Sequence, residues 1–311
     1  MKNKYLSRLH FFLFEPMLPH IFSFYRIGVA LIALLVCGLL YPDFYLLFGQ
    51  NGLVIWDITD TLANPLQPTI GRLYQLIGSN FQPDTFLYLF LGTYIGTLIL
   101  FLVGWQTRIT AFLSWFLHLT LLNTCRFGAY GVESMLNVAL FYSIFFPVGE
   151  TLSLDNKKNK IQPCAYNRLC IRVLQIQMCI IYASAGIEKS LGTEWWDGNA
   201  IWYSLTEEQF WQFNFTWLAD FPLIPKIMGW WTIAMETGYC IGIWFPRTRL
   251  FWLANIILLH LGIGLFMGLY SFAAIMITLN LSAFGYDYFK LAIPVQYNRF
   301  NVAINKNSPF F

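Results

Sequence analysis

The chain has 311 residues, of which 57% are hydrophobic and 11% charged, with a formal net charge of +3 at pH 7. Soluble domains carry about a quarter charged residues, so this composition excludes an ordinary soluble enzyme and predicts a polytopic helical membrane protein. The small net charge, without a basic block, gives no indication of nucleic-acid binding.

Apolar runs long enough to cross a ~30 Å hydrocarbon layer recur along the whole chain. By this criterion we predict an all-α transmembrane bundle of about eight spans. Their ranges are 21–40, 85–104, 109–123, 132–148, 169–187, 227–244, 250–267 and 270–284. The first run has no small-residue cleavage site, so we expect a span there rather than a signal peptide. Residues 1–288 are expected to form one transmembrane domain, and residues 289–311 a short cytoplasmic tail.

The distribution of positive charge predicts the orientation of these spans. Most Lys and Arg residues between the spans fall on one side of the membrane. Those on the other side are Arg72, Arg126, Lys189 and Lys226. The positive-inside rule then places both termini in the cytoplasm and the segments 41–84 and 188–226 on the outer face.

Charged side chains within a span are costly, so each of them is a candidate functional residue. Glu236 and His260 lie on two adjacent predicted spans, each about ten residues from the outer end, which places both near the middle of the bilayer. The carboxylate of Glu236 could therefore orient the imidazole of His260 for proton transfer. A buried polar pair that only fixes helix packing explains the same positions, and both interpretations remain open.

Lys189 follows the predicted span 169–187 and precedes an acidic segment rich in tryptophan, which includes Trp195. A lysine at this position has two interpretations. It is either an anchor whose ammonium group reaches the headgroups, or a base that the aromatic segment partly desolvates. Position alone favours the anchor.

Four other ionisable groups lie in or near the spans. Arg126 and Glu133 are close enough in sequence to form an ion pair near the outer face. His118 has no obvious acidic partner, so we expect it to pack between helices or to bind water. Arg26 is expected to bind backbone carbonyls or to reach the membrane surface. The six cysteines indicate neither a disulfide nor a metal site.

Several short motifs, in order, resemble a known family. The run Tyr182-Ala-Ser-Ala-Gly186-Ile-Glu-Lys189, with Trp195, Gly198 and Tyr203, looks like the lysine segment of vitamin K-dependent gamma-carboxylases and of the related bacterial HTTM membrane domain. Further similarity lies in Phe24-Tyr25-Arg26, Gly52-Leu53-Val54, Tyr130-Gly131, Ser153-Leu154-Asp155, Glu236 with Pro246-Arg247-Thr248-Arg249, and His260-Leu-Gly-Ile-Gly264. The resemblance covers the chain from about Phe11 to Phe284.

This resemblance implies a chemistry for the site. In those carboxylases the matching lysine acts on vitamin K hydroquinone, and the oxygenated product removes a glutamate γ-proton before carbon dioxide adds. Lys189 would then be the base, with His260 and Glu236 as further catalytic residues. Menaquinone or vitamin K hydroquinone would be the cofactor.

One position departs from the carboxylases. Arg126 stands where they have a functional histidine, shortly before Tyr130-Gly131. Because an arginine stays protonated, it cannot relay protons, but it can hold a carboxylate or another anion. We therefore expect Arg126, Tyr130, Trp195 and Glu133 to bind substrate or an anion.

Several functions remain open. Small stand-alone HTTM proteins also resemble membrane proteins of the sporulation-delaying-toxin type, which mature a secreted antimicrobial peptide with partner proteins. The leading hypothesis is therefore a multi-pass protein of the bacterial inner (cytoplasmic) membrane, with a polar cavity open to the periplasmic or extracellular side. It would assist modification or maturation of a small secreted peptide, together with an accessory protein. The alternatives are a quinol-linked carboxylase or epoxidase, a non-enzymatic peptide-binding or immunity-type protein, and a proton-coupled transporter.

Overall fold

The computed structural model describes residues 2–126, 130–156 and 161–286. The predicted tail, 289–311, lies outside these residues. The chain divides into two compact units, which are described separately below. Unit one is Met1–Arg172 with Tyr270–Thr278, and unit two is Val173–Leu269 with Leu279–Phe311. That residues 1–288 form one transmembrane domain stays a prediction.

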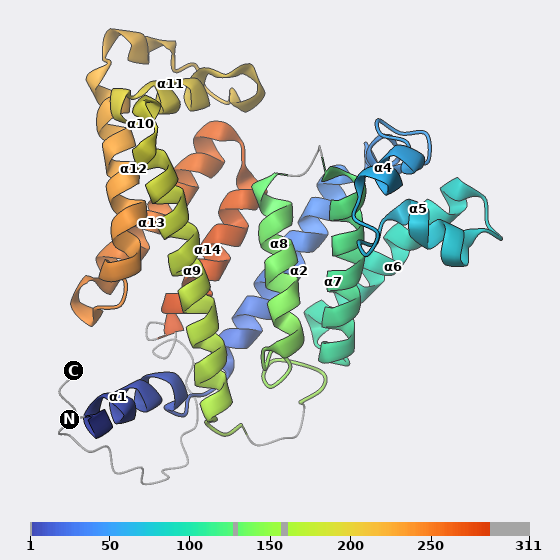
Figure 1. Ribbon diagram of the computed structural model, residues 1–311, viewed down its shortest axis with the longest axis horizontal. Coiled ribbons are helices and arrows are strands. Elements are labelled where there is room, and N and C mark those ends of the chain that lie inside the picture. Colours follow the sequence, from blue (N-terminus) through green and yellow to red (C-terminus); the bar gives the residue numbers. More distant parts are fainter. Residues whose placement is uncertain (1, 127–129, 157–160, 287–311) are drawn as a thin grey trace. The chain divides into compact units, whose positions relative to one another are not determined.

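Over the described residues, eight helices of fifteen or more residues coincide with the predicted spans (Figure 1). They are α2 (His20–Leu40), α6 (Pro83–Val103), α7 (Thr107–Thr124), α8 (Gly131–Phe145), α9 (Ala165–Leu191), α12 (Leu223–Gly242), α13 (Pro246–Met267) and α14 (Tyr270–Phe284). Of these, α2, α6, α9 and α13 are long and apolar enough to cross a membrane, and α8 and α14 are apolar but shorter. An all-helical membrane protein is therefore supported, whereas eight spans and cytoplasmic termini stay predictions.

The remaining described helices are short and lie before or between the long ones. In unit one they are α1 (Lys2–Phe14), α3 (Phe44–Phe48), α4 (Trp56–Leu62), α5 (Ile70–Leu73) and the π-helical turn η1 (Tyr74–Gly78). In unit two they are α10 (Thr193–Asp197), α11 (Asn199–Thr206) and the 3-10 turns η3 (Glu208–Phe210) and η4 (Thr216–Asp220). The predicted outer segments, 41–84 and 188–226, thus contain most of them.

Local chemistry sets the ends of the long helices. Pro83 and Pro246 occupy the first turns of α6 and α13, where a missing backbone N–H costs no hydrogen bond. Gly104 ends α6 with a φ of +74°, and a Cβ there would lie 2.5 Å from the Cβ of Ser153. Only glycine meets both requirements.

In unit one, Arg26 joins α2 to the loop that follows α8. The side chain is fully buried, and its Nη1 donates to the backbone carbonyl of Val148 at 2.6 Å. Nη1 also lies 3.4 Å from the carbonyl of Thr151, and Nη2 donates to that of Leu152. This confirms that Arg26 binds backbone carbonyls.

Asp155, in the motif Ser153-Leu154-Asp155, caps the start of α7. Its carboxylate accepts the backbone N–H groups of Gln106 and Thr107, each at 2.8 Å. Burial alone would raise the pKa of Asp155, but the hydrogen bonds from Thr107 and Gln106 outweigh it and hold the pKa below its usual range. The motif therefore has a structural role, because a carboxylate at a helix N-terminus satisfies otherwise unpaired N–H groups.

We predict that Arg26→Met lowers the free energy of unfolding by roughly 3 kcal/mol, since buried carbonyls lose a charged donor. Exposed Arg247, replaced by Met, serves as the matched control and is expected to change stability by less than about 0.5 kcal/mol. Thermal and denaturant unfolding of the detergent-solubilised proteins measures both. Equal stability of the two variants would contradict this role for Arg26.

The eight-span topology is tested with reporter enzymes that are active on one side of the membrane only. Fusions at Pro65 and Asp220 are expected to report the outer face. Fusions at Asn156 and at the C-terminus are expected to report the cytoplasm, because the positive-inside rule orients the spans that way. An outward C-terminus would show that one span has been miscounted.

Candidate functional site

A charged pair in unit two joins α9 to α12. Lys189 Nζ lies 2.8 Å from Glu236 Oε2. Glu236 is buried at 7% exposure, whereas the Lys189 side chain keeps 22%. A carboxylate in such a place needs a counter-charge, because its own hydration has been lost. The pair therefore combines the carboxylate of Glu236, which is shielded from water, with the ammonium group of Lys189, which water can reach.

Trp195, on α10, covers the ammonium group of this pair. The Nζ of Lys189 lies 5.1 Å from the centroid of the Trp195 ring, within the range of a cation–π contact. The backbone of Trp195 packs against Gly229 of α12 so closely that a Cβ on Gly229 would overlap the Trp195 carbonyl oxygen. In addition, Trp230 Nε1 donates to the carbonyl of Trp196 at 2.9 Å. Thus α12 positions both Glu236 and the indole beside Lys189.

His260 has a different partner from the one expected from the sequence. Its Nε2 lies 2.8 Å from the hydroxyl of Tyr182, and Glu236 faces Lys189 instead. Asn280 Nδ2 donates to the same Tyr182 hydroxyl at 2.7 Å, and Tyr239 donates to Asn280 Oδ1 at 2.7 Å. Tyr182, Tyr239 and Asn280 were not among the predicted site residues. Uncharged side chains inside apolar spans give little sequence signal.

The predicted anion-binding residues Arg126, Tyr130 and Glu133 belong to unit one. Exposed Arg126 donates to Gln67 Oε1 at 2.5 Å, and Glu133 accepts the backbone N–H of Tyr130 at 2.9 Å. Arg126 and Glu133 therefore bind other groups. Both lie in the part of the chain that the structure describes, and they form no ion pair with each other. Burial, and then the charge of Glu133, raise the pKa of Tyr130, which stays protonated. A cavity shared with the residues of unit two stays a prediction.

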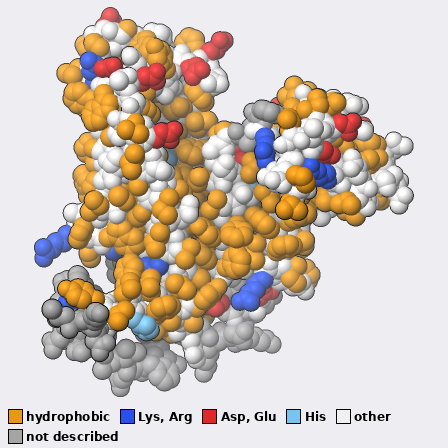
Figure 2. Space-filling model, in the orientation of Figure 1, with side chains coloured by type: hydrophobic (Ala, Val, Ile, Leu, Met, Phe, Trp, Pro, Cys, Tyr) orange, Lys and Arg blue, Asp and Glu red, His pale blue; other side chains and the backbone are white. Residues whose placement is uncertain are grey.

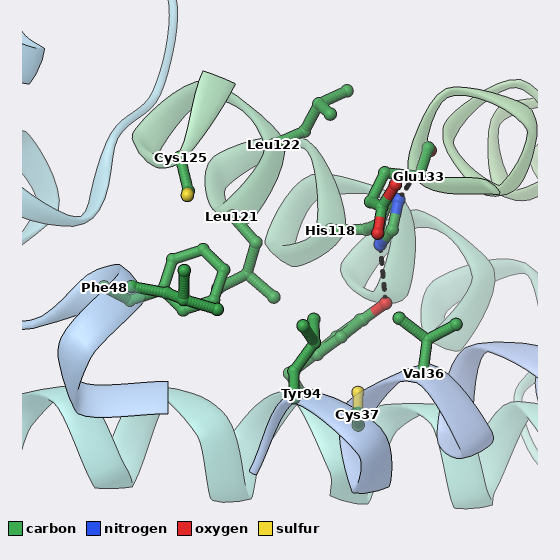
Figure 3. Close-up of a pocket in the computed structure, with 11 residues that line it drawn as sticks. Val36, Cys37, Phe48, Tyr94, His118, Leu121, Leu122, Cys125 and Glu133 are labelled. Atoms are coloured by element: carbon green, nitrogen blue, oxygen red, sulfur yellow. Dashed lines mark hydrogen bonds between the residues drawn. The ribbon is translucent and has the colours of Figure 1, made fainter. Parts of the chain in front are cut away.

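Unit one also contains a small cavity of about 50 Å³ beside His118 (Figure 3). Its lining is mainly apolar and consists of Val36, Cys37, Leu40, Leu47, Phe48, Tyr94, His118, Leu121, Leu122, Cys125 and Glu133. His118 Nε2 lies 2.9 Å from the backbone carbonyl of Glu133, and its Nδ1 lies 2.8 Å from the Tyr94 hydroxyl. Because a carbonyl only accepts, Nε2 carries the proton and Tyr94 donates to Nδ1. Both nitrogens are engaged, so His118 acts here as a packing residue.

Metal binding finds no support in the part of the chain that the structure describes. No group of three His, Cys, Asp or Glu side chains there is arranged to hold an ion. The six cysteines, all in this part, are free thiols.

Comparison with known proteins now decides the family. The HTTM domain model matches residues 73–285. The chain belongs to the HTTM family. This match includes Lys189, Glu236, His260 and Arg126, and it confirms the resemblance to the HTTM domain over residues 73–285.

This HTTM chain is also similar to an uncharacterized protein, YitO, of Bacillus subtilis (strain 168). The two are 23% identical over 206 residues, which is 61% of this chain. The chain spans 64% of the length of that relative. No solved structure matches. The function therefore has to be argued from the site itself.

We predict that the members of the Lys189–Glu236 pair are energetically coupled. Lys189→Met leaves a buried carboxylate without its counter-charge and is expected to cost roughly 3–5 kcal/mol of stability. The double variant Lys189→Met/Glu236→Gln is expected to regain most of this loss, because the uncompensated charge is gone. A double-mutant cycle from unfolding curves measures the coupling, and strictly additive effects would contradict it.

Proposed function

We propose that this HTTM protein uses Lys189 and Glu236 as an acid–base site in the modification or maturation of a small secreted peptide. The site would open to the outer face of the bacterial inner membrane, where an exported peptide and an accessory protein are accessible. The observation that carries the proposal is the 2.8 Å contact of a partly exposed lysine with a buried carboxylate.

Such a pair can hold one proton in two ways. As an ion pair, Lys189 carries the proton; as a neutral pair, Glu236 carries it. In a partly desolvated site the two arrangements are closer in free energy than in water, because burial penalises both charges. Neutral Lys189 is then available as a base towards a substrate, while Glu236 stores the proton.

The outer segment of unit two supports a peptide as the substrate. Several aromatic side chains there are about half exposed, namely Tyr203, Trp211, Phe213, Trp217 and Phe221. Acidic side chains gather at the same end of this unit, around α10 and α11 (Figure 2). Aromatic and apolar surface of this kind is typical of membrane interfaces and of sites that bind other chains.

A quinol-linked reaction is the second candidate, and the position of Trp195 favours it. The indole beside Lys189 offers a flat face to a ring, so Lys189 and Trp195 would hold menaquinone or vitamin K hydroquinone. When bound, the quinol would supply a weakly acidic hydroxyl and, together with molecular oxygen, the strong base that this reaction needs. Lys189 would accept the hydroxyl proton, and Glu236 would stabilise the resulting ammonium group.

The test compares secreted peptides by mass spectrometry in cells that make the wild type, Lys189→Ala, Lys189→Arg or Lys226→Ala. Both Lys189 variants are expected to lower the modified peptide by roughly a hundredfold or more, since arginine keeps the charge but cannot serve as a base. Lys226→Ala, which changes another outer lysine, is the matched control and is expected to match the wild type at equal membrane levels.

Two outcomes separate the alternatives. Full activity of Lys189→Arg would overturn the acid–base role and favour a non-enzymatic binding or immunity-type protein. Quinone content of the same purified proteins provides the second readout: stoichiometric menaquinone that is lost in Lys189→Ala would favour the quinol-linked reaction. Its absence from all of them would leave peptide maturation without a quinol.

A further inference from the structure

The first helix of unit one, α1, is separated from the apolar helix α2 by a short loop that contains two prolines, Pro16 and Pro19. Pro16 has no backbone N–H and disfavours helical geometry in Glu15, so α1 ends at Phe14 instead of continuing into α2. In Figure 1, α1 lies at an angle to α2 rather than in line with it. It is therefore a separate helix beside the start of a segment that is long and apolar enough to cross a membrane.

The beginning of α9, which also belongs to unit one, holds the C-terminal end of α1. Arg172 Nε donates to the carbonyl of Phe12 at 3.0 Å, and Arg172 Cζ lies 3.8 Å from the centroid of the Phe12 ring. Arg168 Nε donates to the carbonyl of Glu15 at 3.1 Å, and its Nη2 forms an ion pair with the Glu15 carboxylate at 3.1 Å. Basic side chains satisfy carbonyls that a helix leaves unpaired at its C-terminus. These contacts fix the direction in which α1 leaves the bundle.

One side of α1 is apolar and exposed. Tyr5, Leu6 and Leu9 each expose more than half of their surface. Because residues three and four apart are neighbours on a helix, these three side chains form one face. Phe11 is exposed to a similar extent, but it follows Leu9 by two residues and so lies about 200° further around the helix, on the other side. The apolar face of α1 is thus defined by Tyr5, Leu6 and Leu9.

Positive charge accompanies this face. Residues 2–13 contain Lys2, Lys4 and Arg8 and no acidic residue. Arg8 directly precedes Leu9, which places it at the edge of the apolar face. A long basic side chain at such an edge can keep its stem on apolar surface while its charged end reaches a phosphate. A helix with an apolar aromatic and leucine face and with basic polar residues is typical of helices that lie in a membrane surface.

Charge favours lipid over the C-terminal segment of the chain as the partner of this face. Residues 289–311 contain Lys290, Arg299 and Lys306 and no acidic residue, so their charge has the same sign as that of α1. Anionic phospholipid headgroups have the opposite sign, and the surface potential that they create attracts basic segments. The acyl chains beneath the headgroups can take up the apolar side chains. Since α2 follows α1 after a short loop, the bilayer surface is within reach.

We propose that α1 lies in the surface of the bilayer and binds anionic phospholipids, with Tyr5, Leu6 and Leu9 towards the acyl chains and Arg8 at the phosphates. This surface belongs to unit one. It is independent of the acid–base role that is proposed for unit two.

The experiment places a fluorescent amino acid in the full chain, either in place of Leu9 or in place of Phe11. The proteins are reconstituted in liposomes whose acyl chains carry a bromine quencher, made of phosphatidylcholine with or without phosphatidylglycerol. With phosphatidylglycerol, quenching at position 9 is expected to exceed quenching at position 11 by roughly threefold or more, because the two side chains point to different sides of the helix. Without it, this excess is expected to fall by about half or more, because the attraction of the anionic surface is lost.

A variant of the apolar face provides a second readout. Leu6→Ser, with the probe at position 9, is expected to lower the quenching, because apolar surface is removed while the charges stay. Phe11→Ser is its matched control, since it removes an exposed apolar side chain from the other side of the helix, and it is expected to leave the quenching unchanged.

Three outcomes would overturn the proposal. Equal quenching at positions 9 and 11 would show that α1 does not lie in the membrane surface with the apolar face inward. Quenching at position 9 that is the same in both lipid mixtures would show that anionic headgroups are not recognised. Quenching that appears only after removal of residues 289–311 would show that the C-terminal segment, and not lipid, covers the apolar face of α1.

Discussion

Polar groups inside a hydrocarbon layer have to be satisfied by the protein itself, and this constraint decides which side chains of the chain meet. In unit one, the Nη atoms of Arg26 donate to carbonyls of the loop after α8. In unit two, Lys189 compensates the charge of Glu236, and Tyr182, which Asn280 links to Tyr239, binds His260 Nε2. The hydrogen bonds of Arg26 thus help to fix how the long helices of unit one pack. The ion pair of Lys189 and Glu236 and the hydrogen bonds around His260 do the same in unit two.

The two polar clusters of unit two differ in what they can do. The pair of Lys189 and Glu236 keeps contact with water through the lysine, so protons can enter and leave it. The cluster around His260 is almost completely buried, and Tyr182, Asn280 and Tyr239 are joined to it by hydrogen bonds. The first is suited to exchange protons with a substrate, and the second to hold a fixed arrangement.

Helix positions follow from the sequence because the length of an apolar run is a one-dimensional property. The predicted span 270–284, for example, coincides with α14. Partner choice is different, since it depends on how each helix is rotated about its axis. Glu236 and Tyr239 lie on one face of α12, three residues apart, and the sequence does not show that the first meets Lys189 and the second Asn280. The expected pair of Arg126 and Glu133 fails for a similar reason, because Glu133 caps its own helix.

Gly229 has a consequence for how a substrate reaches the site. Its lack of a side chain lets the backbone of Trp195 rest directly on α12, so the indole has no room to retreat in that direction. If the pair acts as proposed, the Trp195 side of the site is held by backbone packing, and the movable part is the four-carbon stem of Lys189. A substrate would then reach Glu236 through rotamer changes of one side chain, which are fast compared with the movement of a lid.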